Sequence, residues 1–128
     1  MIHLDHLILP VTEPRRSVEF YTKLIGLTHL GSAGPFEVIR VNSSLNIDLM
    51  SHPSPGQMHL AFAVDRITFD NVRTRLAGQD ITIGSDVFTR DGYTAPNPYG
   101  AHGMADSFYF YDPDNHNLEL RCYDNNSA

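Results

Sequence analysis

Residues 4–11 carry the sequence LDHLILPV, and residues 57–64 carry QMHLAFAV. A shift of 53 positions (59 − 6) aligns the two stretches and places His6 on His59. Each stretch is an apolar run of the length and composition expected for a β-strand. Because the predicted elements after each stretch also come in the same order, the sequence indicates a chain built from two similar halves.

The first half, residues 1–51, predicts the element order βαβββ. Its strand at 2–11 stops near Pro10. A helix then begins at Pro14 and ends before Gly26, a residue type that often adopts the left-handed conformation after a helix. Three strand-like runs separated by turn residues complete this half, at 27–31, 36–41 and 45–51.

The second half, residues 57–128, repeats this order after a linker at 52–56 that is rich in Pro and Ser. Its predicted elements are a strand, a helix and three strands, at 57–65, 68–77, 81–88, 105–111 and 116–122. The segment Thr89–Met104 has no counterpart in the first half, and segments of this length are usually functional or disordered. We interpret it as a loop that covers a substrate, with simple disorder as the alternative. The length fits a single domain, 1–128, made of two modules.

The composition is that of an ordinary globular protein, with 41% hydrophobic and 19% charged residues. No apolar run approaches the roughly 20 residues that a membrane helix needs, and the N-terminus lacks the basic and apolar regions of a signal peptide. We therefore expect a cytoplasmic protein without a membrane segment, and the single Cys122 fits a reducing compartment. With 15 acidic and 9 basic residues and a net charge of −6, the chain has no basic stripe for phosphates, so nucleic acid is not an expected partner.

Three predicted strands each carry one potential metal ligand on the face opposite their apolar residues: His6, His59 and Glu119. Two imidazoles and one carboxylate suit Zn, Fe, Mn, Co or Ni, and they leave coordination positions open for substrate or water. The repeat places the two histidines at corresponding points of the two halves. The residues therefore predict a divalent metal site, although this ligand set does not determine which metal is bound.

Other side chains are candidates for substrate contacts. Arg121 lies two residues beyond Glu119 on the same strand face, where it could bind an anionic substrate or pair with an acidic neighbour. Tyr93, Tyr99 and His102 lie on the long loop and are candidate catalytic residues, as acid–base groups or as a cover over the substrate. The alternative for these three is exposure without a role.

Several stretches of the chain resemble the vicinal oxygen chelate superfamily. They are LDHLILPV at 4–11, SVEFYTKLIGL at 17–27 and FYFYDPDNHNLEL at 108–120. The third is similar to the closing hairpin of that family, in which a tight turn precedes the strand that bears the metal carboxylate. The family includes glyoxalase I, fosfomycin-modifying enzymes, extradiol dioxygenases, methylmalonyl-CoA epimerase and bleomycin-resistance proteins. The resemblance covers nearly the whole chain.

The resemblance implies an α+β fold in which two βαβββ modules form a half-open mixed β-barrel with helices on its outer face. It also implies His6, His59 and Glu119 as the metal ligands, and a homodimer that in some members exchanges modules. In glyoxalase-like members the last strand of the first module supplies a fourth ligand, and Asp48 occupies that position here. Aspartate is one methylene shorter than the glutamate expected there, so direct ligation and a water-mediated contact both remain open.

The family's common chemistry is coordination of a substrate oxygen by the metal, which stabilises an oxyanion as charge develops. The resemblance implies a glyoxalase-like lyase or isomerase acting on a small oxygenated metabolite, with an extradiol-type dioxygenase as the enzymatic alternative. A fosfomycin enzyme is disfavoured because Ile8 stands where that group has threonine. The competing class is a non-enzymatic, drug-sequestering protein of the bleomycin-resistance type. Such proteins typically lack the three ligands, and their retention here favours an enzyme.

Overall fold

The structure is a computed structural model that describes residues 1–124. Its chain divides into two compact units, and each unit carries one four-stranded sheet. The first unit consists of Met1–Met58 together with Asp112–Asn115, the second of His59–Tyr111 together with the residues from His116 onward. No helix within residues 1–124 is long and apolar enough to cross a membrane.

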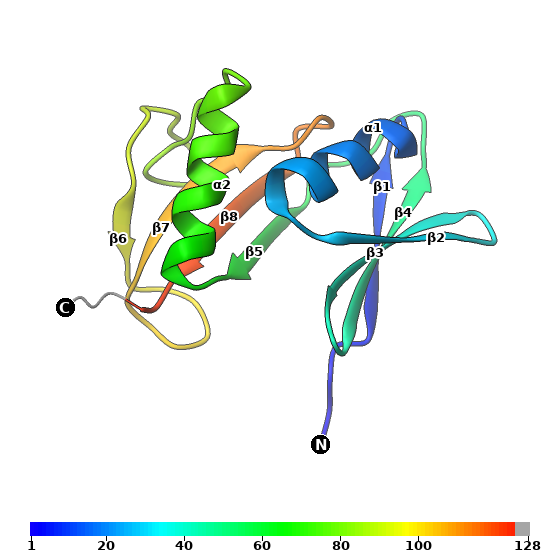
Figure 1. The fold of residues 1–128 in the computed structure, drawn as a ribbon, viewed down its shortest axis with the longest axis horizontal. Coiled ribbons are helices and arrows are strands. Elements are labelled where there is room, and N and C mark those ends of the chain that lie inside the picture. The colour runs from blue at the N-terminus through cyan, green and yellow to red at the C-terminus, as the bar shows by residue number, and fades with distance from the viewer. Residues whose placement is uncertain (125–128) are drawn as a thin grey trace. The chain divides into compact units, whose positions relative to one another are not determined.

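The first unit contains one helical segment and four strands (Figure 1). Strand β1 runs parallel to β4, the other neighbours are antiparallel, and the sheet order is β1-β4-β3-β2. The predicted helix is confirmed: Pro14 lies in its first turn, and Gly26 ends it with a left-handed φ of 94°. The element bounds are β1 (His6–Val11), α1 (Pro14–Glu19), the π-helical η1 (Phe20–Ile25), β2 (Thr28–Ala33), β3 (Phe36–Asn42) and β4 (Leu45–Ser51).

The second unit repeats this architecture, and α2 lies across one face of its sheet (Figure 1). The sheet order is β5-β8-β7-β6, with β5 parallel to β8, which is the order of the first unit element for element. The predicted α+β fold with two βαβββ modules is therefore confirmed. The element bounds are β5 (His59–Ala63), α2 (Arg66–Gly78), β6 (Ala95–Asn97), β7 (Ala105–Tyr111) and β8 (Asn117–Cys122).

The strand register shows which single residues of the two modules occupy equivalent positions. In the first unit Ile8 of β1 pairs with Asp48 of β4. In the second unit Ala61 of β5 pairs with Glu119 of β8. Since Ile8 and Ala61 each lie two residues after the aligned histidines, Asp48 and Glu119 occupy equivalent places.

One face of each sheet is packed against its helix. Side chains along a strand point alternately to the two faces, and the apolar ones identify the face that the helix covers. In β1 Leu9 and Val11 are fully buried whereas His6 and Ile8 are exposed, as the predicted alternation requires. Burying each large apolar side chain contributes about 1.5–3 kcal/mol, so the helix-covered faces hold most of the stabilising contacts. The fully buried apolar residues include Leu9, Tyr21, Ile39, Leu49, Leu76, Phe108, Phe110, Leu118 and Leu120.

The strand predicted at 81–88 is wrong. This segment makes only isolated bridges, and the edge strand of the second module is β6, which lies inside the predicted loop 89–104. A polar side chain takes up a backbone N–H that a strand would use for sheet pairing. The Asp91 carboxylate accepts hydrogen bonds from the Ser85 N–H at 3.0 Å and from the Ser85 hydroxyl at 2.6 Å. Gly84 allows a close turn, since a Cβ there would lie 1.5 Å from the carbonyl oxygen of Thr89.

Candidate metal centre

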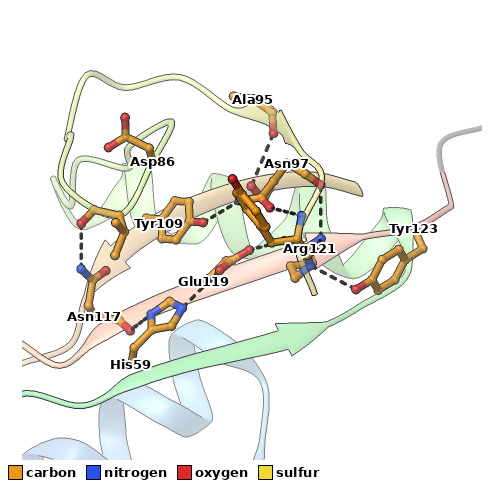
Figure 2. A network of polar contacts seen from close by, with 12 residues as sticks. His59, Asp86, Ala95, Asn97, Tyr109, Asn117, Glu119, Arg121 and Tyr123 are labelled. Atoms are coloured by element: carbon orange, nitrogen blue, oxygen red, sulfur yellow. Dashed lines mark hydrogen bonds and ion pairs between the residues drawn. The ribbon is translucent and has the colours of Figure 1, made fainter. Parts of the chain in front are cut away.

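His59 and Glu119 lie side by side on neighbouring strands β5 and β8 (Figure 2). The Nε2 atom of His59 is 3.3 Å from Oε1 of Glu119. The other ring nitrogen, Nδ1, is 2.8 Å from the backbone carbonyl oxygen of Asn117. A carbonyl oxygen only accepts hydrogen bonds, so Nδ1 carries a hydrogen and donates it. In the neutral ring, Nε2 is then left with a lone pair.

This arrangement suits a cation between the two side chains. In the neutral form of the ring, the Nε2 lone pair would face a carboxylate oxygen, and two acceptors at this distance are satisfied only by a proton or a metal ion. Bonds of about 2.0–2.2 Å from one tetrahedral ion would separate two ligand atoms by roughly 3.4 Å. The 3.3 Å found between Nε2 and Oε1 of Glu119 fits two ligands of one ion.

The Glu119 carboxylate is 5% exposed, and a buried arginine holds its second oxygen. Nη1 of Arg121 donates to Oε2 at 2.7 Å, and the Arg121 side chain is also 5% exposed. Burying a charged group costs free energy unless an opposite charge and hydrogen bonds accompany it. Arg121 provides both at Oε2 and leaves Oε1 facing His59.

Tyr109 completes the surroundings of Glu119. It lies directly opposite Glu119 in the β7–β8 register, and its ring stacks on that of His59 with centroids 6.0 Å apart. Burial, followed by the negative charge of Glu119 and a hydrogen bond to it, raises the pKa of Tyr109 to about 12. The phenol therefore stays protonated and donates to the carboxylate, while its oxygen accepts from Nδ2 of Asn97 at 2.7 Å.

Sequence reasoning missed Tyr109 and Asn97. A signal for Tyr109 exists in the run Phe108–Tyr111, where phenylalanine and tyrosine alternate and therefore place both hydroxyl groups on one strand face. No comparable signal exists for Asn97, because its contact depends on the unpredicted strand β6.

Arg121 holds the loop after β6. Its Nη2 atom donates to the carbonyl oxygens of Asn97 at 3.3 Å, of Tyr99, and of Gly103 at 2.8 Å. Of the two roles considered for Arg121, pairing with an acidic neighbour is the one observed, through Glu119. Substrate binding by this guanidinium remains a prediction.

Within residues 1–124, no hydrogen bond joins the side chains of the three loop candidates to the Glu119 carboxylate. Tyr93 and Tyr99 have exposed side chains, at 68% and 77%, and Tyr99 reaches Arg121 through its backbone carbonyl. The backbone N–H of His102 donates to the hydroxyl of Tyr123 at 3.4 Å, and the His102 ring meets the Tyr123 ring edge-on. A catalytic role for these three residues remains a prediction.

His6 belongs to the first unit, and its Nδ1 also contacts an oxygen acceptor, in this case the exposed side chain of the preceding residue. Its Nδ1 is 2.7 Å from a carboxylate oxygen of Asp5. This hydrogen bond is the main cause that raises the pKa of His6, with a smaller contribution from the charge of Asp48. Both histidines thus commit Nδ1 to an oxygen acceptor, which is the usual arrangement of a metal-binding histidine that coordinates through Nε2.

Within residues 1–124, no three His, Cys, Asp or Glu side chains form a ready metal-binding group. His6 lies in the first unit, whereas His59 and Glu119 lie in the second. The structure therefore brings together two of the three predicted ligands, and the set of three remains a prediction.

Comparison with known proteins agrees with the duplicated fold. The sequence matches the family model of the Glyoxalase/Bleomycin resistance protein/Dioxygenase superfamily over residues 3–120. The chain belongs to this superfamily. The match confirms the resemblance seen in the sequence motifs, including its extent over nearly the whole chain.

Solved structures of this superfamily are similar over nearly their whole length. Oxidase ChaP-H2 is 26% identical with a TM-score of 0.85, covering 94% of this chain and 93% of its own. Oxidase ChaP-H1 is 26% identical with a TM-score of 0.83, covering 95% of this chain and 96% of its own. TnmS3, an antibiotic-binding protein from Streptomyces sp. CB03234, shares the fold at 18% identity and a TM-score of 0.69, covering 95% of this chain and 96% of its own.

Proposed function

We propose that this protein is a metal-dependent enzyme in which His6, His59 and Glu119 hold one divalent ion and a small oxygen-bearing organic molecule is the substrate. The observation that carries the proposal is the state of the two histidines. Each commits Nδ1 to an oxygen acceptor, and in the second module Nε2 faces a buried carboxylate oxygen at 3.3 Å. Such fixed rings are typical of metal ligands.

The surrounding residues prepare this carboxylate for a cation. Arg121 occupies Oε2 of Glu119, so one oxygen is available to an ion. Tyr109 donates a second hydrogen bond to the same carboxylate and keeps its proton because its pKa is about 12. When bound, the metal would act as a Lewis acid on a substrate oxygen.

We propose oxidation of the substrate, with molecular oxygen as the oxidant that is reduced, as the first reaction to test. Its support is the similarity to two oxidases at 26% identity, with more than nine tenths of both chains covered. A glyoxalase-like lyase or isomerase is the second candidate, and the register supports it: Asp48 occupies the place in the first module that Glu119 occupies in the second. In that reaction class a carboxylate at this place would serve as a fourth ligand.

The competing proposal is a protein that sequesters a small molecule without catalysis, as TnmS3 binds an antibiotic on the same fold. Metal content separates the two. A homodimer and a cytoplasmic location remain predictions under either proposal.

Metal analysis of untagged protein purified without chelator tests the proposal. We expect about one equivalent of a transition metal in the wild type, and loss of most of it in His59→Ala. The matched control is His52→Ala, which removes an exposed histidine of the linker whose Nδ1 accepts a hydrogen bond from the backbone of Ser54. This control should keep its metal.

A folded wild type that stays empty after incubation with Zn²⁺, Fe²⁺, Mn²⁺, Co²⁺ and Ni²⁺ in turn would overturn the proposal and favour the sequestering protein. Equal metal loss in His52→Ala and His59→Ala would show instead that the bound metal is adventitious. Oxygen uptake by the iron-loaded protein with candidate substrates then distinguishes an oxidase from a lyase or isomerase, since the latter two consume no oxygen.

A further inference from the structure

We infer that Arg121 is a positioning residue that joins the loop 97–103 to the Glu119 carboxylate, so that the metal site is fully formed only while this loop lies against the guanidinium. The inference rests on the proposed function, because it concerns how Glu119 is prepared for a metal. Its loop component is independent of any metal.

One guanidinium connects the two parts. Nη1 of Arg121 donates to Oε2 of Glu119 at 2.7 Å, and the two hydrogens of Nη2 are shared among three backbone carbonyl oxygens at the two ends and the middle of the loop. Nε donates to the hydroxyl of Tyr123 at 3.2 Å. The planar fork of arginine serves all these acceptors at once, which a lysine ammonium on a flexible stem could not do in the same geometry.

The loop keeps this contact dry. As whole residues, Arg121 and Glu119 are each 4% exposed. A charge pair attracts more strongly away from water, so removal of the loop carbonyls would admit water and weaken the hold on Oε2. The carboxylate would then be free to rotate away from the orientation that points Oε1 at His59.

Gly100 is a second observation that the loop is shaped to fit Arg121. Its φ of +100° is in the left-handed region, and a Cβ at this position would lie 2.7 Å from Nε and 2.8 Å from Cζ of Arg121. The hydroxyl of Tyr123 would be equally close, at 2.8 Å. The backbone therefore reaches the guanidinium only with glycine at position 100.

Asn97 provides a second connection between the loop and the carboxylate. Its carbonyl oxygen accepts from Arg121, while its side-chain amide donates to the hydroxyl of Tyr109 at 2.7 Å. Tyr109 in turn lies directly opposite Glu119 in the β7–β8 register. Asn97 thus contacts both Arg121 and Tyr109, and Figure 2 shows its side chain beside the Tyr109 hydroxyl.

Two variants test the inference from opposite sides. Arg121→Gln removes the guanidinium, and Gly100→Ala pushes the loop and the guanidinium apart while both Arg121 and Glu119 are retained in the sequence. The matched controls are Arg66→Gln and Gly56→Ala. Arg66 also pairs with a carboxylate of this sheet, Asp106 at 2.6 Å, and lies 4.9 Å from the centre of the Phe69 ring; a Cβ at Gly56 would meet no atom within 4 Å.

Limited digestion of the metal-free protein with chymotrypsin measures the loop. Cleavage after Tyr99, whose side chain is 77% exposed, should accelerate about tenfold or more in both test variants, as expected for loss of a charged hydrogen bond. Cleavage after Phe88, which is 90% exposed in another part of the same unit, should keep its rate and serves as the internal standard. Both controls should match the wild type at both sites.

Metal titration measures the coupling. We expect Arg121→Gln to weaken the binding of Zn²⁺ by about 10- to 100-fold, the range seen when a partner of a metal ligand is removed, and Gly100→Ala to weaken it by about 10-fold. Unchanged cleavage after Tyr99 in Arg121→Gln would overturn the loop assignment. Faster cleavage in Gly100→Ala with unchanged Zn²⁺ affinity would overturn the coupling alone. A wild type that binds no metal would overturn the proposed function and the coupling with it, while the cleavage rates would still decide the loop assignment.

Discussion

Positions 46, 48 and 50 of β4 correspond in register to positions 117, 119 and 121 of β8. The first pair is asparagine in both strands, and the second is Asp48 against Glu119. The third pair differs in kind, since Met50 stands where the other module has Arg121. Glu119 and Arg121 are buried, whereas Asp48 and Met50 are half-buried. The duplicated strands thus carry two carboxylates in different settings. Glu119 is paired with an arginine of its own strand, whereas Asp48 has no arginine at the equivalent position of its strand.

The difference comes from the segment after the helix in each module. After η1 the first module continues directly into β2, an ordinary edge strand. After α2 the second module first makes the irregular segment 81–94 and then the short β6. The loop after β6 supplies the carbonyls that cover Arg121. The buried face of the second module therefore combines two differences, Arg121 in place of Met50 and the added segment whose carbonyls Arg121 binds.

The largest expected effect separates the two carboxylates. Glu119→Gln should lower the affinity for the metal by about 100-fold or more, because it removes a charged ligand and the partner of Arg121. Asp48→Asn should lower it by about 10-fold at most, as expected for a water-mediated contact. Elemental analysis and titration with Zn²⁺ give both values on matched preparations. Equal losses would mean that the two modules contribute equivalent ligands and would replace the three-ligand proposal with four.

How much of this arrangement the sequence predicts depends on the range of the interaction. Most strands and both helices are predictable because apolar periodicity is a local property, and the family resemblance singles out Asp48, which the register then places opposite Ile8 as Glu119 is opposite Ala61. The sequence leaves the role of Arg121 open because its partners at 97–103 are main-chain carbonyls, which no side-chain pattern encodes. The strand at 81–88 is predicted wrongly because its apolar residues suggest a sheet, while Ser85 and Asp91 bind each other and the local backbone.

The next expected effect concerns the segment in which the modules diverge. Gly84→Ala should destabilise the protein by about 3 kcal/mol, because the new Cβ would meet the backbone of Thr89 and the clash cannot be relieved by a side-chain rotation. Gly56→Ala is the control and should change the free energy of unfolding by no more than about 0.5 kcal/mol. Urea unfolding followed by circular dichroism measures both. A tolerated Gly84→Ala would indicate that this segment can form the strand that its apolar residues suggest.

A smaller effect is expected at the turns that precede β4 and β8. The turn Asp112–Asn115 belongs to the first unit, where the hydroxyl of the buried Tyr21 donates to Asp112 at 2.7 Å and the Thr12 hydroxyl donates to Asp114 at 2.6 Å. Tyr21→Phe should cost about 1.5–3 kcal/mol, the value of a buried hydrogen bond to a charged group.

The matched hydroxyl removal is Ser43→Ala in the exposed turn between β3 and β4, which should change stability by about 0.5 kcal/mol or less. The same urea titration gives the comparison. Equal stability of the two variants would mean that the Tyr21 hydroxyl does not stabilise the turn before β8. That turn would then depend on contacts within itself, as the turn before β4 depends on the Asn42 side chain. The two modules would in that case be more alike than the hydrogen bonds indicate.

The smallest effect is a pH dependence confined to the edge of the first module. The hydroxyl of Ser32 and Nε2 of His29 both contact the Glu37 carboxylate, and with the charge of Arg15 they lower its pKa from the ordinary value of 4.5, the Ser32 hydrogen bond being the largest cause. A lowered folded-state pKa stabilises the fold above the unfolded value, and this stabilisation is lost as the pH falls through the folded-state value. Glu37→Gln should therefore be less stable than the wild type near neutral pH, and the difference should shrink once the pH falls below about 4.5.

Urea midpoints of both proteins across this pH range measure the difference in stability. Glu19→Gln is the control, since Glu19 pairs with Lys23 on the exposed side of the same unit. A difference that stayed constant down to acidic pH would mean that Glu37 contributes through packing, and that its hydrogen-bonded charge is not what holds β2 against β3.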